Sequence, residues 1–215
     1  MAWEREVATI IAIPHTMYTT VVWAHHLRQL QVPTVHYLHY ARGMPIDVAR
    51  NRFVKELLKS VDTEYLFFLD SDVLPGPDAL VRLMSHKRRI VSGLYYRRVP
   101  PIHPTAYIYD EKEKGFKVIK DPGEVGLVEV DAVGLGCCLI HRSIFEQLDP
   151  PWFKWTKERP YVLKEGEPEV SEDLYFFYRV RKELGEKVYL DTTVRCGHVA
   201  VAIVDGYGKV RFSDI

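Results

Sequence analysis

The 215-residue sequence predicts an α/β fold in which helices flank a mixed, mainly parallel sheet. Two observations predict it. In the first hundred residues, short apolar runs alternate with segments of helical periodicity, which is the pattern of parallel strands joined by helices. From about residue 99 the sequence becomes rich in β-branched and aromatic residues with glycine breaks, which predicts a β-rich second half.

The first half alternates regularly between the two kinds of element. Apolar runs predict strands, and segments with apolar residues every three or four positions predict helices. We expect strands at 7–15, 32–40, 65–69 and 89–96, and helices at 19–31, 45–60 and 76–87. The buried stripe predicted for the second helix consists of Val48, Phe53, Val54, Leu57 and Leu58.

The second half begins with a hairpin whose charged turn lies at 111–115. The segment 126–141 is β-rich, and 187–191 is a last short strand. A helix is expected at 171–185, because a serine can cap its start and a glycine follows its last turn. No repeat or linker interrupts the chain, so we expect one domain, with residues 1–98 binding a nucleotide and 99–215 carrying the acceptor and catalytic groups.

Residues 149–169 combine proline, charge and aromatic side chains without periodicity, which predicts a long loop. Because long loops in compact domains are often functional, we expect residues 150–170 to form a mobile lid. Its aromatic residues Trp152, Phe153 and Trp155 suit two roles equally. They can stack on a sugar or pack the loop against the core.

Composition excludes several classes of function. The 29 basic and 29 acidic residues give a formal net charge of zero, which argues against nucleic-acid binding through bulk charge. No apolar run approaches the roughly 20 residues of a membrane span, and the N-terminus lacks a signal-peptide pattern. We therefore expect a cytoplasmic protein without a transmembrane segment.

The three cysteines are consistent with a reducing compartment. Together with His198, the residues Cys137, Cys138 and Cys196 have the composition of a zinc site. However, neighbouring residues of a strand point to opposite faces, so Cys137 and Cys138 do not easily share one metal. Buried free thiols are the favoured interpretation.

The segment "EYLFFLDSDVLPG" (64–76) carries the most informative pattern. An apolar strand ends directly in Asp70 and Asp72, and ligands of open α/β sheets bind outside the carboxyl ends of such strands. Carboxylates favour hard ions such as Mg²⁺ or Mn²⁺, which bridge to substrate phosphates. The alternative is that both aspartates only begin the turn before Pro75 and Gly76.

In its context this D-x-D resembles the DxD motif of GT-A glycosyltransferases, and the order of the surrounding segments resembles family 2. In "GMPIDVARNRF" (43–53), the resemblance places Arg50 and Asn51 beside the nucleotide, as it does Pro14 and His15 at the end of the first strand. It implies a role for Asp70 at the nucleotide-sugar and at the metal. "GLGCCLIHRSIF" (134–145) resembles the acceptor-side strand and the helix that follows it.

"SEDLYFFYRV" (171–180) resembles the E-D motif of the same enzymes, in which the aspartate is often the catalytic base. The resemblance therefore implies a catalytic role for Asp173, with Glu172 beside it. Acidic residues are also favoured in the first turn of any helix by the helix dipole, which is the alternative explanation.

"RCGHV" (195–199) follows the last expected strand, where several metal-dependent GT-A enzymes place a late histidine ligand. The resemblance implies that His198 joins Asp72, and Asp70, at the metal. An imidazole ligand suits Mn²⁺ better than Mg²⁺. With nine histidines in the chain, a histidine with no ligand role is the competing interpretation.

The expected activity is that of a metal-dependent hexosyltransferase. It would move a sugar from a nucleotide-diphospho-sugar to a hydroxyl of a glycan, a lipid-linked sugar or a small molecule, with inversion if Asp173 is the base. Positive charge from Arg97 or Arg98 can assist the leaving group. The alternatives are a retaining enzyme, a sugar-phosphate nucleotidyltransferase, and a noncatalytic nucleotide- or carbohydrate-binding domain. The glycine-free "IAIPHTMYTT" (11–20) counts against the nucleotidyltransferase.

Overall fold

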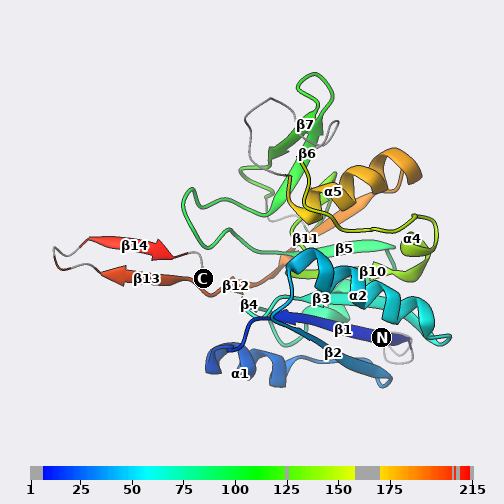
Figure 1. The fold of residues 1–215 in the computed structure, drawn as a ribbon, viewed down its shortest axis with the longest axis horizontal. Coiled ribbons are helices and arrows are strands. Elements are labelled where there is room, and N and C mark those ends of the chain that lie inside the picture. The colour runs from blue at the N-terminus through cyan, green and yellow to red at the C-terminus, as the bar shows by residue number, and fades with distance from the viewer. Residues whose placement is uncertain (1–6, 124–125, 158–169, 205, 207–208, 214–215) are drawn as a thin grey trace.

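A seven-stranded sheet forms the centre of the protein (Figure 1). The computed structural model describes residues 7–123, 126–157, 170–204, 206 and 209–213. The strands of the central sheet are β1 (Ala8–His15), β2 (His36–Arg42), β3 (Thr63–Leu69), β5 (Ile90–Leu94), β8 (Leu127–Val130), β10 (Cys137–His141) and β11 (Val188–Arg195).

The strand order is β2-β1-β3-β10-β5-β11-β8. Parallel pairs join β1 to β2 and β3, and β5 to β11, whereas β10 and β8 are antiparallel to their neighbours. The expected mixed, mainly parallel sheet is therefore confirmed. The sequence did not predict that β10, from the second half of the chain, would lie between β3 and β5 of the first half.

Helices cover both faces of the sheet. They are α1 (Val21–Gln29), α2 (Ile46–Lys59), α3 (Ala79–Ser85), α4 (Arg142–Glu146) and α5 (Glu172–Arg179). A π-helical segment, Val180–Leu184, extends α5, and Gly185 ends it in the left-handed region at φ +60°. The expected helix at 171–185 is therefore present, with a change of helix type in its second half.

The remaining strands are short. They are β4 (Val73–Leu74), β6 (Ala106–Asp110), β7 (Gly115–Val118), β9 (Ala132–Val133), β12 (Gly197–His198), β13 (Val201–Val204) and β14 (Val210–Ser213). The hairpin between β6 and β7, closed by the pair Asp110 and Gly115, confirms the turn expected at 111–115. β13 and β14 form a second hairpin that projects from the sheet (Figure 1).

Two hydrophobic cores lie on opposite faces of the sheet. Successive residues of β3 enter different cores: Phe67 packs on the face covered by α1 and α3, and Phe68 on the face covered by α2, α4 and α5. This explains why β3 is a continuous apolar run. Cys137 and Cys138 divide between the cores in the same way, and all three cysteines are buried free thiols, as expected.

The predicted buried stripe of α2 is only partly confirmed. Val48 is 50% exposed, so its place in the buried stripe of α2 was wrong. It lies in the first turn of the helix and lines an open cavity with Pro150 and Pro151. Leu58 is only partly buried, whereas Phe53, Val54 and Leu57 are fully buried.

Two of the three aromatic residues singled out in the expected loop pack against the core. Trp152 and Phe153 are buried, and the Trp152 indole N–H donates to the carbonyls of Phe145 and Leu148 at 3.0 and 2.9 Å. Trp155 is exposed. Residues 158–169, most of the expected lid, lie outside the described residues.

A buried carboxylate fastens α3 to β11. Asp191 accepts hydrogen bonds from His86 Nε2 at 2.7 Å and from the Thr193 amide at 2.8 Å. Burial alone would raise the pKa of Asp191, but these hydrogen bonds outweigh it and hold the pKa below its usual value.

We expect Asp191→Ala to lower the free energy of unfolding by about 2 to 3 kcal/mol near pH 7, because it removes hydrogen bonds to a buried charge. Since the folded pKa lies below the unfolded one, this contribution is present above about pH 4 and is lost as the pH falls through the folded pKa. Urea unfolding of both proteins between pH 3 and pH 7 measures the difference. A constant gap between wild type and variant across that range would contradict the assignment.

Candidate functional site

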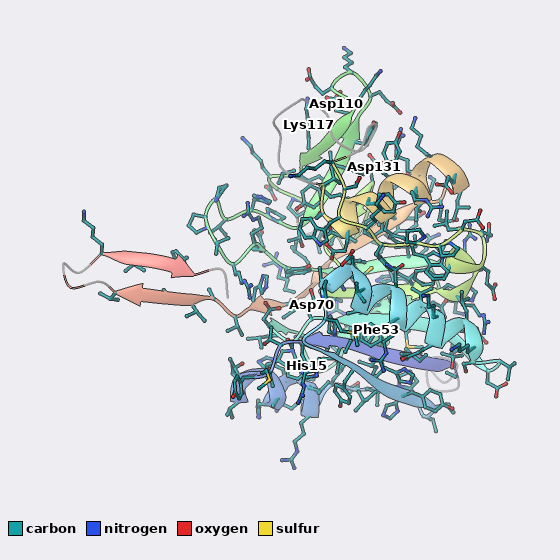
Figure 2. The ribbon with its side chains drawn as sticks, viewed as in Figure 1. His15, Phe53, Asp70, Asp110, Lys117 and Asp131 are labelled. Carbon is teal, nitrogen blue, oxygen red and sulfur yellow. The ribbon has the colours of Figure 1, made fainter. Side chains whose placement is uncertain are left out.

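A cavity of about 470 Å³ opens at the carboxyl ends of β1 and β3. Its lining includes Pro14, His15, Asp70, Asp72 and Arg98. Figure 2 labels His15 and Asp70 at this end of the sheet. All five of these lining residues were singled out by sequence, and they share one cavity in the position where open α/β sheets bind their ligands.

Arg50 connects the first aspartate of the DxD segment to the start of α5. Its Nη2 lies 3.2 Å from Asp70 Oδ2, and its Nε lies 3.0 Å from Glu172 Oε1. The guanidinium also lies 5.2 Å from the centre of the Phe68 ring. Because Arg50 is only 3% exposed, a single buried cation serves two carboxylates.

The protonation equilibria of this group reflect its burial. Burial raises the pKa of Asp70 above its ordinary value, and the charge of Arg50 offsets only part of that effect. Burial and the neighbouring charge of Asp173 raise the pKa of Glu172 to about 7, against the opposing effect of Arg50. For Arg50 itself, burial favours the neutral form, but the two carboxylates outweigh it and raise the pKa.

Asp72 and His198 meet because β12 returns to pair with β4. His198 lies opposite Val73 in this short ladder, and the Val199 amide donates to the Asp72 carbonyl at 2.8 Å. His198 Nε2 consequently lies 3.4 Å from Asp72 Oδ2. His198 Nδ1 lies 2.7 Å from the Tyr96 carbonyl, which can only accept, so Nδ1 carries a proton and Nε2 faces the carboxylate.

Arg98 completes this group by pairing its Nη1 with the same Asp72 oxygen. Burial would raise the pKa of Asp72, but the hydrogen bond from His198 and the charge of Arg98 lower it. For His198 burial alone would lower the pKa, and the contacts with Asp72 and the Tyr96 carbonyl raise it above the ordinary value.

The donor set at Asp72 suits a divalent ion. Among the described residues, no group of three or more His, Cys, Asp and Glu side chains is arranged to hold a metal. Asp72 and His198 nevertheless present an oxygen and a nitrogen side by side, and a carbonyl fixes the histidine ring, as is usual for metal ligands. Asp70 Oδ1 is buried and has no hydrogen-bond partner. Two protein ligands and an unsatisfied oxygen fit an ion that also takes substrate phosphates.

Asp173 lies in the first turn of α5 and is half-buried. Its Oδ1 accepts a hydrogen bond from the Ser171 hydroxyl and one of 2.7 Å from the Leu174 amide. Its charge also acts on Tyr107 of β6: burial, and then Asp173, raise the pKa of that phenol to about 12. The charge of Asp173 also contributes to the raised pKa values of Arg50 and Tyr95, so it acts on residues from both halves of the chain.

The Asn51 side chain hydrogen-bonds to the backbone of Trp152 and Phe153. Its Nδ2 donates to the Phe153 carbonyl at 2.6 Å, and its Oδ1 accepts from the amides of Trp152 and Phe153 at 2.9 and 3.2 Å. It contributes to the cavity formed with Pro150 and Pro151 rather than to the one at Asp70. Its amide fixes the buried segment to α2, a role that the sequence pattern did not reveal.

The glycines of "GLG" (134–136) allow a close contact behind the aspartates. A Cβ on Gly136 would lie 2.7 Å from Val73 Cγ2 and 2.9 Å from the Tyr95 hydroxyl. The Gly136 amide donates to that hydroxyl, and the Gly136 carbonyl accepts from the Asp70 amide at 3.1 Å. The two glycines are evident in the sequence, but the sequence did not predict that they make room for Tyr95.

Comparison with known proteins identifies the fold. No family model and no curated protein matches the sequence. The structure is similar to A197 from STIV, with 18% identity, a TM-score of 0.58, and coverage of 97% of this chain and 95% of that one. It is also similar to GalNAc-T7, whose crystal structure contains UDP, GalNAc and Mn²⁺, with 12% identity, a TM-score of 0.57, and coverage of 89% of this chain and 43% of that one.

The fold is GT-A-like. At these identities the similarity extends to the fold alone, so the expected fold class is confirmed and the roles of individual residues are proposals. No helix in the described part of the chain is long and apolar enough to cross a membrane.

We expect Arg50→Met to lower the free energy of unfolding by about 3 to 5 kcal/mol at pH 7, because two buried carboxylates lose their cation. Glu172→Gln, the matched control, keeps the pair between Arg50 and Asp70 and should cost less than about 1.5 kcal/mol. The loss in Arg50→Met should shrink as the pH falls and the carboxylates take up protons. Denaturant unfolding at pH 5 and pH 7 measures both effects, and equal losses in the two variants would contradict the bridging role.

Proposed function

We propose that the protein is a metal-dependent glycosyltransferase that moves a hexose from a nucleotide-diphospho-sugar to an acceptor hydroxyl. The observation that carries this proposal is the pairing of Asp72 with His198 at a cavity beyond the carboxyl end of β3. The GT-A-like fold supports it, as does GalNAc-T7, a structural neighbour crystallised with UDP, GalNAc and Mn²⁺.

In this proposal the donor lies in the cavity, and residues 1–98 supply most of its contacts. Pro14 and His15 line the nucleotide side, and Asp70, which also lines the cavity, accepts from a hydroxyl of the ribose or sugar. Arg50 orients that carboxylate from behind. Asp72 and His198 hold Mn²⁺ or Mg²⁺, with Asp70 nearby, and a bound ion supplies positive charge that stabilises the departing diphosphate.

Residues 99–215 bind the acceptor and carry the base. Asp173 removes the proton of the acceptor hydroxyl, the oxygen attacks the anomeric carbon, and the bond from that carbon to the diphosphate oxygen breaks. The nucleoside diphosphate leaves, and direct attack inverts the anomeric centre. Glu172 adjoins the base and is held by Arg50, so the bridge aligns donor and acceptor sides. The acceptor is a glycan, a lipid-linked sugar or a small molecule.

One observation favours a second candidate. The carboxylate of Asp173 already accepts hydrogen bonds from Ser171 and the Leu174 amide, which is the behaviour of a residue that stabilises a helix start. If that is its whole role, the protein is a retaining glycosyltransferase or a noncatalytic sugar-nucleotide-binding domain. The three buried free thiols support the expected cytoplasmic location in either case.

We expect transfer to require a divalent ion, with Mn²⁺ at least as effective as Mg²⁺, because one proposed ligand is an imidazole. Asp72→Ala should abolish metal-dependent nucleotide binding while the fold is kept. Its matched control is Asp78→Ala, which removes an exposed carboxylate that precedes α3 and pairs with Arg82. The measurements are hydrolysis and transfer with a panel of nucleotide sugars, and nucleoside diphosphate titrations with and without Mn²⁺. Full activity in excess EDTA would contradict the metal role.

Asp173→Asn should reduce turnover by about 100-fold or more with little change in donor affinity, because it removes the base and keeps the shape. Ser171→Ala is the control for the helix start, since it removes a contact to Asp173 and leaves the carboxylate in place. Steady-state kinetics and donor titration separate the two. Near-normal turnover by Asp173→Asn would favour the retaining or noncatalytic alternative.

A further inference from the structure

Two nitrogen-bearing side chains, an arginine and a histidine, converge on one oxygen of Asp72. Arg98 pairs through Nη1 with Oδ2, and His198 Nε2 lies 3.4 Å from the same atom. Both Asp72 and Arg98 are partly buried, with 29% and 27% of their side chains exposed, and both line the cavity. The guanidinium therefore lies where the proposed metal ion would have to bind.

A metal ion and this guanidinium compete for one oxygen of Asp72. An ion held by Asp72 Oδ2 and His198 Nε2 would bring two positive charges close to the charge of Arg98 in a partly buried site, where solvent screens charges only weakly. The ion and the guanidinium would also draw on the lone pairs of the same oxygen. Metal binding at Asp72 therefore favours the departure of Arg98 from that oxygen.

A diphosphate in the cavity would be a second partner for Arg98. The loop that carries it is closed at its base, where Tyr96 pairs with Pro104 and the Arg97 amide donates to the His103 carbonyl at 3.0 Å. The backbone is thus held beside the cavity, which the Arg98 side chain lines. A guanidinium presents a planar fork of donors that matches phosphate oxygens, so a diphosphate in the cavity is a suitable partner.

We propose that Arg98 is a diphosphate-binding residue that exchanges partners with the metal. With the cavity empty it neutralises Asp72, and when a metal ion takes Asp72 it moves to the diphosphate of the donor. This inference rests on the proposed function for the metal at Asp72 and adds the exchange. Arg98 then weakens metal binding in the empty protein and strengthens diphosphate binding.

Two separate titrations test the exchange. Mn²⁺ alone is titrated by calorimetry or electron paramagnetic resonance, and inorganic pyrophosphate is titrated into protein that is already saturated with Mn²⁺. We expect Arg98→Ala to bind Mn²⁺ about tenfold more tightly, because a competing cation is lost, and pyrophosphate about tenfold more weakly, because a charged donor is lost. The two changes have opposite signs because a positive charge is lost, and Arg97→Ala distinguishes a specific contact at Asp72 from a general change in charge.

Two variants serve as controls. Arg98→Lys keeps the charge, so its Mn²⁺ affinity should stay near that of the wild type, while its pyrophosphate affinity should fall because lysine lacks the fork. Arg97→Ala removes the same charge from the neighbouring half-buried position and should change either affinity by less than about twofold, because Asp72 pairs with Arg98 and His198 and a more distant charge is partly screened by salt. Comparable thermal midpoints show that the variants are folded.

The outcomes separate this inference from the function on which it rests. Mn²⁺ binding that is lost in Asp72→Ala but unchanged in Arg98→Ala would overturn the exchange and leave the metal site standing. Unchanged pyrophosphate affinity in Arg98→Ala would also overturn it. If neither the wild type nor Arg98→Ala bound Mn²⁺, the proposed metal site and the exchange would both fall.

Discussion

The candidate site depends on one buried interaction, the contact of the Arg50 guanidinium with two carboxylates. Asp70 lies 20 residues and Glu172 lies 122 residues further along the chain, so one side chain from α2 fixes the end of β3 to the start of α5. Removing a carboxylate from water is unfavourable unless a cation accompanies it. The position of Asp70 at the cavity and the first turn of α5, which also carries Asp173, therefore depend on the same charge.

A second constraint is supplied by backbone pairing. β4 follows the DxD segment directly and has only two residues, and its partner β12 comes from near the end of the chain. This pairing places the His198 imidazole beside Asp72, although β12 itself has only two residues. It also leads the chain across the cavity, which Val199 and Val201 help to line before the projecting hairpin begins (Figure 1). Residues from both ends of the sequence thus form one surface.

The sequence predicted what depends on local patterns. Strands, helices and the 111–115 turn follow from periodicity and turn chemistry, and the ends of β1 and β3 place Pro14, His15, Asp70 and Asp72 at one cavity. Contacts between distant segments were less accessible. Val48 fits the apolar period of α2 but lies beyond the reach of the core, and nothing in the order of residues indicates that Asn51 fastens Trp152 and Phe153. Arg98 was one of several cations, and only the fold brings it to Asp72.

The antiparallel insertion of β10 has a consequence for how the chain folds. β3 and β5 both belong to the first hundred residues, yet neither completes its hydrogen bonding until Cys137–His141 enters between them. A ribosome that has released only the first half therefore exposes two apolar strands with open edges, which are prone to pair with other chains. Because loop closure must precede this long-range pairing, we expect the pairs of β10 with β3 and β5 to form after the local helices and hairpins. Strands from both halves of the chain share one sheet, so we expect that neither half folds independently.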